Sequence, residues 1–480
     1  MGDPYEERYT SKEMQAILSD ENKFKTWRAL WVAIAKAQKD LGLQHDNGQP
    51  RITDEMISEL EANKDSLNLE RAKEIEKKKK HDVSSHIAAY AEQCPKAGGI
   101  IHLGCTSRDI TDNCELMQIR QAGDLVIKKL VNAIDYTAAN AAKYAEIMTL
   151  GRTHYQSAQA TTVGRRMAMH GEELVLAFND LEERVDTLPF RGIKGTVGTQ
   201  ADQLALFNGD RQKVEALEQL IAEQCDFDSV LGWTGQTYHR LIDYQIASSL
   251  GTIAVAARRF SNTVRLLQGM EEIEEPFDEK SQVGSTAMPW KRNPKNCERI
   301  SSLTYAVIGA AHELGEMAAN QWLEGSVEDS ALRRIKILRE CFYATDAILD
   351  LYIDTAIGLR VYAEMIDAHV RDKLPLIAAN TFLMEAVKKG GDRQVLHDVF
   401  KTYAMESVAE YRKTGQMTFL KRIAEDPNTK LDANDIERIL KNQALFAGRA
   451  VEQSNGFAQY ARTRIKAYAD KLGYVPEVKV

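Results

Sequence analysis

Residues 281–296 read SQVGSTAMPWKRNPKN, the least regular stretch of the chain. They contain one glycine, two prolines and three cations with no apolar period, so they are not a core helix. Connections between packed helices usually take about 2 to 8 residues, whereas this irregular segment extends from about residue 271 to residue 296. Met288 and Trp290 are unusual in a disordered linker. The stretch therefore predicts a binding or catalytic loop rather than a plain connector.

Long helices are predicted on both sides of this loop. Apolar residues recur at alternating steps of four and three over residues 246–267, 300–317 and 335–352, and more weakly over 163–181. Residues 116–147 add a fifth candidate, and none of these intervals contains a proline that would break a helix. Five such elements predict an all-α bundle. Their seams are rich in Ala and Leu, which favours a bundle shared between subunits.

The chain is long enough for several domains, because 480 residues exceed what one hydrophobic core normally supports. We expect an N-terminal helical domain over residues 1–111, the central bundle with its loop over 112–360, and a C-terminal helical domain over 361–480. In the last of these, glycine and proline separate shorter helices. No strand pattern is long enough to predict a major sheet.

Composition excludes several classes of function. The net charge of -8 argues against a nucleic-acid binder, whose binding face would have to be strongly basic. The six cysteines include no C-x-x-C pair, so neither a zinc site nor a disulfide framework is indicated, and a reducing cytoplasm is the simplest setting. The N-terminus does not resemble a signal peptide, and no apolar run is long enough to predict a membrane span.

Three further polar islands interrupt the helices at residues 99–113, 151–162 and 234–240. Each lies at a predicted helix end, where free backbone N–H groups favour anions. His154 is the leading acid or base candidate because histidine titrates nearest neutral pH, although a lone histidine is more often structural. Ser285 lacks the G-x-S-x-G signature of a nucleophile, so a cap or turn is its common alternative role. Lys291 is either an anion ligand or a solvated surface lysine.

Two other patterns bear on function. The pair His81-Asp82, with His45 upstream, allows a metal-dependent HD-type phosphohydrolase as a remote alternative, but His397-Asp398 shows that such pairs arise by chance. The chain has no GxxxxGK[ST] or GxGxxG motif. A substrate phosphate would therefore be held by separate side chains, and the candidates are Arg8, Lys80, Thr106, Ser107, Arg299, Ser330 and Arg334.

Residues 284–294, GSTAMPWKRNP, resemble the signature G-S-S-x-M-P-x-K-x-N-P of the fumarase/aspartase superfamily. The polar islands follow in the order of that superfamily, and the resemblance covers essentially the whole chain. Within the superfamily the chain is most similar to the adenylosuccinate lyase family. The motifs that carry this similarity are ERY near the start, KHD at residues 80–82, CPKAGGIIHLGCTS, RTHYQSAQATTVG, TGQTYHR, EEPF and DSALRR.

The resemblance implies a homotetramer whose central bundle takes helices from all subunits, with each active site built from three chains. It also implies β-elimination of fumarate from adenylosuccinate, giving AMP, and from the succinyl-carboxamide ribotide of purine synthesis, giving AICAR, without a metal or organic cofactor. Another lyase of the superfamily, such as argininosuccinate lyase, is the nearest alternative. A catalytically silent scaffold of the same fold is the alternative from a different class.

Roles for single residues follow from the same resemblance. Ser285 matches the general base that removes a proton from the succinyl carbon, and His154 matches the general acid that protonates the departing nitrogen. Lys291 and Asn293 match groups that hold the carboxylates and the developing negative charge. The other matched positions contact the substrate, its nucleotide or its phosphate, and they are Thr153, Thr106, Ser107, Gln236, His81, Asp82, Arg8, Tyr9, Lys80, Arg299, Ser330 and Arg334.

Two positions depart from the family pattern. Thr286 replaces a second serine, which should be tolerated because Ser285 matches the base. Gly325 stands where relatives usually have an arginine that contacts the phosphate. Loss of such a charge-assisted contact typically costs about 1.5–3 kcal/mol. Nucleotide affinity therefore depends on whether Arg333 or another cation substitutes, and a Gly325→Arg change is expected to lower KM.

Overall fold

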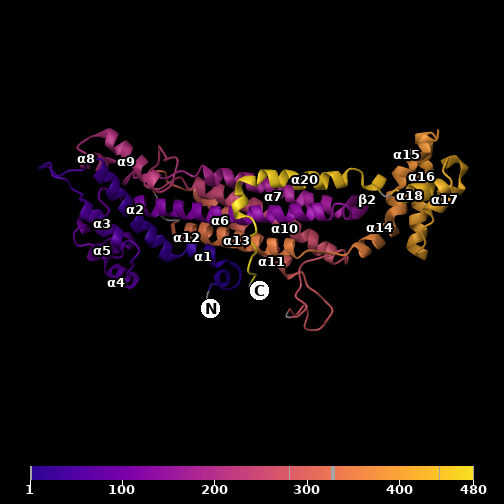
Figure 1. The fold of residues 1–480 in the computed structure, drawn as a ribbon, viewed down its shortest axis with the longest axis horizontal. Coiled ribbons are helices and arrows are strands. Elements are labelled where there is room, and N and C mark those ends of the chain that lie inside the picture. Colours follow the sequence, from indigo (N-terminus) through magenta and orange to yellow (C-terminus); the bar gives the residue numbers. More distant parts are fainter. Residues whose placement is uncertain (1–2, 281, 326–329, 443, 479–480) are drawn as a thin grey trace.

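The computed structural model describes residues 3–280, 282–325, 330–442 and 444–478. The molecule is elongated, and a bundle of long helices separates N-terminal helices at one end from C-terminal helices at the other (Figure 1). The bundle contains α6 (Ser107–Lys143), α7 (Val163–Asp186), α10 (Leu241–Gln268), α11 (Lys295–Ala319) and α13 (Ala344–Ile357). α10 packs on α7 and α11, and α6 packs on α7 and α13. The prediction of an all-α fold is confirmed.

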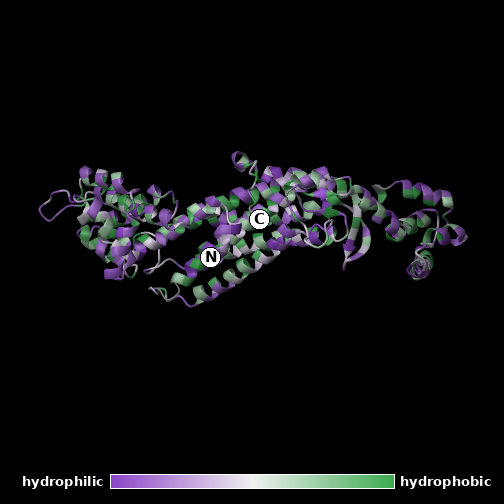
Figure 2. Cartoon of the chain, turned by 90° about the horizontal axis from the view of Figure 1, so that it is seen from below, coloured by the Kyte–Doolittle hydropathy of each residue, from purple (hydrophilic) through white to green (hydrophobic). Residues whose placement is uncertain are grey.

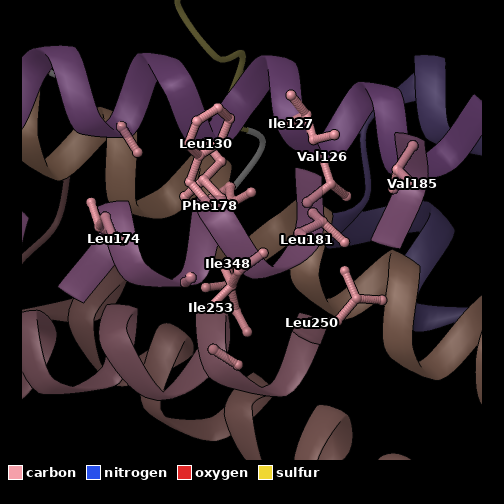
Figure 3. Close-up of a cluster of buried hydrophobic side chains, with 14 of the residues drawn as sticks. Val126, Ile127, Leu130, Leu174, Phe178, Leu181, Val185, Leu250, Ile253 and Ile348 are labelled. Carbon is pink, nitrogen blue, oxygen red and sulfur yellow. The ribbon is translucent and has the colours of Figure 1, made fainter. Parts of the chain in front are cut away.

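The core of the bundle is made by the predicted apolar seams. Leu130, Phe178, Ile253 and Ile348 come from four different helices and meet in one buried cluster (Figure 3). The seam has one exception, because Ile335 was expected in the core but is 46% exposed in the single chain. It begins a π-helix, η3 (Ile335–Tyr343), that follows the short α12 (Ser330–Arg334). A π-helix has a wider turn than an α-helix, so the seven-residue spacing does not apply there.

The N-terminal end contains mostly short helices, and side chains cap the first turns of several of them. These elements are the π-helical η1 (Tyr5–Tyr9), α1 (Lys12–Ile17), α2 (Asp20–Asp40), α3 (Asp54–Asn63), α4 (Leu69–Lys79), α5 (Asp82–Gln93) and the 3-10 turn η2 (Gly98–Ile100), joined later by α8 (Ala201–Leu206) and α9 (Arg211–Gln224). Ser19 and Thr53 each accept a hydrogen bond from the first turn of the helix that follows. Ser19 therefore sets the start of α2 at Asp20.

The C-terminal part contains shorter helices. They are α14 (Ala363–Ile377), α15 (Ala379–Lys388), α16 (Arg393–Thr414), α17 (Phe419–Glu425), η4 (Pro427–Thr429), α18 (Ala433–Lys441), α19 (Ala444–Ala447), α20 (Ala450–Arg464) and η5 (Lys466–Lys471). α20 returns along the molecule and packs on α6 and α7. The division of the chain at residue 361 stays a prediction. Figure 2 shows that hydrophilic and hydrophobic residues alternate around the helices along the whole molecule.

Two small antiparallel ribbons join the helices. β1 (Met148–Thr153) pairs with β2 (Gln156–Thr162), and β3 (Ile273–Glu274) pairs with β4 (Arg360–Val361). The polar island at residues 151–162 ends at the N-cap of α7, as expected, but it also forms most of the β1–β2 hairpin, which was not predicted. Its strands are largely polar and partly exposed, so they lack the alternation of apolar residues that identifies a strand in a sequence.

The described residues give three further results. The six cysteines are all free thiols. No described helix combines the length and the apolar character needed to cross a membrane. Among the residues that the structure describes, no group of three or more His, Cys, Asp and Glu side chains is placed to share a metal ion. The phosphohydrolase alternative therefore gains no support from the arrangement around His81 and Asp82.

Candidate active site

Ser285 lies in the long loop between β3 and α11, where its hydroxyl oxygen faces backbone donors. The N–H groups of Met288 and Ala287 donate to Ser285 Oγ over 3.2 and 3.4 Å. Donors of this kind stabilise a negative charge on the oxygen that accepts them. The loop therefore gives Ser285 an environment suited to a serine that loses its proton.

The two arms of this loop are tied together below Ser285. Asn293 Nδ2 donates to the Gly284 carbonyl over 3.1 Å, and Lys295 Nζ donates to the Val283 carbonyl over 2.9 Å. A Cβ on Gly284 would lie 2.1 Å from the Lys291 carbonyl, so only glycine allows the arms to approach this closely. Asn293 thus holds the loop in the single chain, while the Lys291 side chain is exposed.

Glu275 joins the two ends of the loop, where the chain leaves β3 and enters α11, and the sequence did not indicate this role. Its two carboxylate oxygens accept the N–H groups of Asn296 and Cys297 in the first turn of α11, each over 3.0 Å. Glu275 is only 4% exposed, and burial raises its pKa even though both N–H groups favour the carboxylate. The sequence shows Glu275 only as part of EEPF, because its partners follow some 20 residues later.

We expect Glu275→Gln to lower kcat by about tenfold to a hundredfold. The amide replaces a charged acceptor by a neutral one and cannot accept both N–H groups, and charged hydrogen bonds are worth about 1.5–3 kcal/mol. Steady-state kinetics and thermal unfolding would measure the effect. Glu279→Gln is the control, since Glu279 is an exposed carboxylate of the same loop that binds Arg292 and Arg360. Equal losses of kcat in both variants would contradict a special role for Glu275.

His154 occupies the tip of the β1–β2 hairpin. Thr153 pairs with Gln156, so His154 and Tyr155 form a two-residue turn. Their φ angles are 51° and 61°, a left-handed conformation that favours Asn and Gly in such turns. Holding non-glycine residues there costs roughly 1–2 kcal/mol each. The cost of this turn points to a role for the exposed side chains at its tip.

A third group gathers where α5 and α6 begin. His81 Nδ1 accepts the Ser84 N–H over 3.3 Å, so in the neutral imidazole Nε2 carries the proton and donates to Ser107 Oγ over 3.3 Å. Thr106 caps α6 with its side chain, and Lys80 has a left-handed φ of 54° at the end of α4. Asp82 begins α5 and accepts the N–H of the next residue. The predicted KHD and threonine-serine motifs therefore lie together.

The residues predicted to bind the nucleotide lie in separate parts of the single chain. Tyr9 and Arg299 line one cavity of about 410 Å³, and Arg8 is exposed beside Tyr9. Arg334 Nε lies 3.1 Å from Glu115 and lines a different cavity. Gln236 lies beside the segment that carries Gly325, since its N–H donates to the Glu324 carbonyl over 2.7 Å. The Ser330 side chain lies outside the described part of the chain.

One chain does not bring these groups into a single site. The hairpin with His154 lies toward the C-terminal end of the bundle, the His81–Ser107 group lies at the N-terminal end, and the loop with Ser285 extends from the middle (Figure 1). The structure therefore joins His81 with Ser107, Tyr9 with Arg299, and Ser285 with Asn293. It separates the candidate acid from the candidate base.

Arg333 does not replace the arginine that is missing at position 325. It is fully buried, and its guanidinium binds Glu115, the Asp243 carboxylate at 2.7 Å and the Tyr238 hydroxyl at 3.1 Å. Burial opposes its charge, but Glu115 and its neighbours hold the pKa of Arg333 above the ordinary value. The suggestion that Arg333 grips the phosphate is therefore not supported by its contacts.

Gly325 itself leaves little room for an arginine. Its φ is 155°, and a Cβ at this position would lie 2.8 Å from the Gln236 Cβ. A Gly325→Arg change would therefore displace Gln236, a predicted substrate ligand, and the expected fall in KM would be offset by that displacement.

Two solved structures share the fold of this chain. The 3-carboxy-cis,cis-muconate lactonizing enzyme from Pseudomonas putida matches with a TM-score of 0.81 at 21% identity, covering 96% of this chain and 99% of that chain. The fumarate lyase from Mesorhizobium sp. BNC1 matches with a TM-score of 0.80 at 19% identity, covering 94% and 98%. These two likenesses show that the chain shares the fold of both enzymes over nearly its whole length.

Sequence comparisons are more specific. A family model described as lyase matches residues 2–309, and one described as adenylosuccinate lyase C-terminus matches residues 375–457. The adenylosuccinate lyase of Saccharomyces cerevisiae is 38% identical over 95% of this chain and 93% of its own length. That of Methanocaldococcus jannaschii is 32% identical over 85% and 86%. The chain belongs to the adenylosuccinate lyase family, and it is a fumarate-releasing lyase.

Proposed function

We propose that the protein removes fumarate from adenylosuccinate to give AMP, and from the succinyl-carboxamide ribotide to give AICAR. Ser285 takes a proton from the succinyl carbon next to a carboxylate. The electron pair left on that carbon forms the double bond of fumarate as the C–N bond breaks. His154 gives a proton to the departing nitrogen, so charges and atoms balance with no cofactor. This mechanism is supported by the similarity to adenylosuccinate lyases and by the residues matched above.

The pair of N–H donors on Ser285 Oγ is the observation that supports this mechanism best. A serine hydroxyl is a poor base in water, so its alkoxide must be stabilised before it can take a carbon-bound proton. Met288 and Ala287 supply donors at 3.2 and 3.4 Å, and Lys291 on the same loop would add positive charge when the loop meets the substrate carboxylates. Thr153 and Gln236 would position the succinyl group.

The proposal also includes a homotetramer with active sites shared between chains. In one chain the bundle leaves large apolar side chains exposed, namely Leu176 on α7, Val255 on α10, and Tyr305 and Ile308 on α11. Leu176, Val255 and Ile308 border an apolar groove of about 510 Å³. Covering this face with a second copy would bury these side chains and would bring the hairpin of one chain toward the loop of another. We place this enzyme in the cytoplasm.

Fumarate release tests the proposal directly. The full-length protein is incubated with adenylosuccinate, and fumarate is followed with and without a chelator. We expect release from adenylosuccinate that the chelator does not change. Release from argininosuccinate instead of adenylosuccinate would reject the substrate, and loss of activity with chelator would favour a metal enzyme.

A further inference from the structure

Lys23 faces the same cavity as Arg334, although the two residues are far apart in the sequence. The cavity has a volume of about 770 Å³ and lies between the α1–α2 junction and α12 with η3. Lys23 is in the first turn of α2, and its side chain is 13% exposed. Its ammonium lies over the rings of Phe24 and Trp27, at 4.6 and 5.1 Å from their centroids. The Lys23 ammonium is thus held against two aromatic rings, in the same cavity as Arg334, a residue predicted to bind the phosphate.

The charge of Lys23 is poorly compensated by the protein. Burial and the Arg334 guanidinium both lower the pKa of Lys23. The carboxylate nearest to it belongs to Asp20, which is 80% exposed and 3.9 Å away, so solvent weakens that ion pair. Lys23 and Arg334 therefore share one cavity at an electrostatic cost to the fold, whereas Arg339, the third cation of its wall, is paired with Asp3 and Glu6.

Other carboxylates of the cavity wall are engaged with other cations. Glu21 binds Lys25 over 2.7 Å, and Glu6 binds Arg339 over 2.5 Å. Glu115 reaches Arg334, but it is also bound by the buried Arg333. A dianionic ligand between Lys23 and Arg334 would remove the repulsion between them, which is the usual way that proteins hold a phosphate monoester.

The cavity also lies near the predicted substrate group. The pKa of Lys23 is lowered chiefly by burial and by Arg334, and the Asp82 carboxylate opposes this with a smaller effect, so the start of α5 lies within electrostatic range of this cation. Next to it, the His86 ring stacks on Phe24 with their centroids 3.8 Å apart, and burial together with Lys23 lowers the pKa of His86 to about 4. A neutral His86 leaves Lys23 and Arg334 as the positive groups that would meet the ligand.

We propose that Lys23 and Arg334 together bind the 5′-phosphate of the substrate nucleotide, so that Lys23 supplies the cation that Gly325 does not. This inference rests on the proposed function, because it takes the ligand to be a nucleotide monophosphate. Gly325 carries no side chain, and Arg333 is committed to Glu115 and Asp243.

The test compares binding of AMP with binding of adenosine, which lacks the phosphate. In calorimetry on the full-length protein, Lys23→Gln is expected to weaken AMP binding by about tenfold to a hundredfold and to leave adenosine binding unchanged, as expected for one lost charged contact. Lys23→Arg should keep most of the AMP affinity. Lys25→Gln is the matched control on the same helix, and its AMP affinity should equal that of the wild type. In kinetics, Lys23→Gln should raise KM more than it lowers kcat.

Thermal unfolding distinguishes a phosphate-binding role of Lys23 from a structural role. Removing the charge relieves repulsion with Arg334, so Lys23→Gln should unfold at the same temperature or higher. A lower unfolding temperature with equal losses of AMP and adenosine binding would overturn the proposal. If the wild type releases fumarate from adenylosuccinate but Lys23→Gln keeps the wild-type ratio of AMP to adenosine affinity, the function stands and the phosphate role fails. A wild type that neither releases fumarate nor binds AMP would reject both.

Discussion

Replacing Ser285 by alanine is expected to lower kcat by a factor of about 10²–10⁴, the range typical for loss of a general base. The hydroxyl accepts N–H groups from its own loop, so the change should leave the helical fold and the assembly intact. Steady-state kinetics, thermal unfolding and size-exclusion chromatography would measure these properties. Thr286→Ala is the matched control because it removes the neighbouring hydroxyl, and it should keep near-normal turnover. A Ser285→Ala enzyme with near-normal kcat would remove Ser285 from its role.

The separation of the hairpin and the loop extends this test to the assembly. His154→Ala alone should lose turnover by a similar factor, since it removes the predicted acid. If His154 and Ser285 of one site come from different chains, mixed oligomers of the two inactive variants contain some sites with both residues. Turnover should therefore return after the two variants are unfolded and refolded together. Two different affinity tags would verify that mixed oligomers have formed. If these oligomers stay inactive, both residues of a site come from one chain.

The long helices could be predicted from the sequence because their pattern is local. Each apolar side chain is followed three or four positions later by another, and this spacing alone predicts the burial of Ile253 and Val307. Ile335 was misplaced because a π-helix changes the number of residues per turn, and no residue type marks that change. The hairpin that holds His154 was missed because polar, partly exposed strands have no apolar alternation.

The parts of the candidate site that sequence reasoning missed all depend on contacts between distant positions. Glu275 and Lys23 are ordinary charged residues in the sequence, and they differ from others only in what the fold places beside them. Glu275 meets the first turn of α11, and Lys23 meets Arg334 across a cavity. Recognition of the motifs could name Ser285 and His154, but it could not tell which cation near the phosphate is free to bind.

Arg333 tests this distinction between a buried ion and a ligand. Arg333→Leu should destabilise the protein by about 3–5 kcal/mol, because it leaves Asp243 as a buried carboxylate without its cation and leaves Glu115 with Arg334 in place of two arginines. The Tyr238 hydroxyl loses the same partner but keeps Asp243 at 2.6 Å. Denaturant unfolding would show the loss as a lower midpoint with little change of slope. If Arg333 instead bound the substrate phosphate, Arg333→Leu would raise KM and leave the unfolding midpoint unchanged. That result would contradict a structural role.

Two variants make the result for Arg333 specific to burial. Arg371→Leu breaks an exposed ion pair with Asp367 on one helix, and exposed pairs contribute only about 0–1 kcal/mol, so its midpoint should hardly move. Adding Glu115→Gln and Asp243→Asn to Arg333→Leu removes the uncompensated charges, and it should recover part of the lost stability because neutral amides are far less costly to bury. If the triple variant is less stable than Arg333→Leu alone, the carboxylates are not the source of the loss, and Arg333 would have to act through its packing against Tyr238.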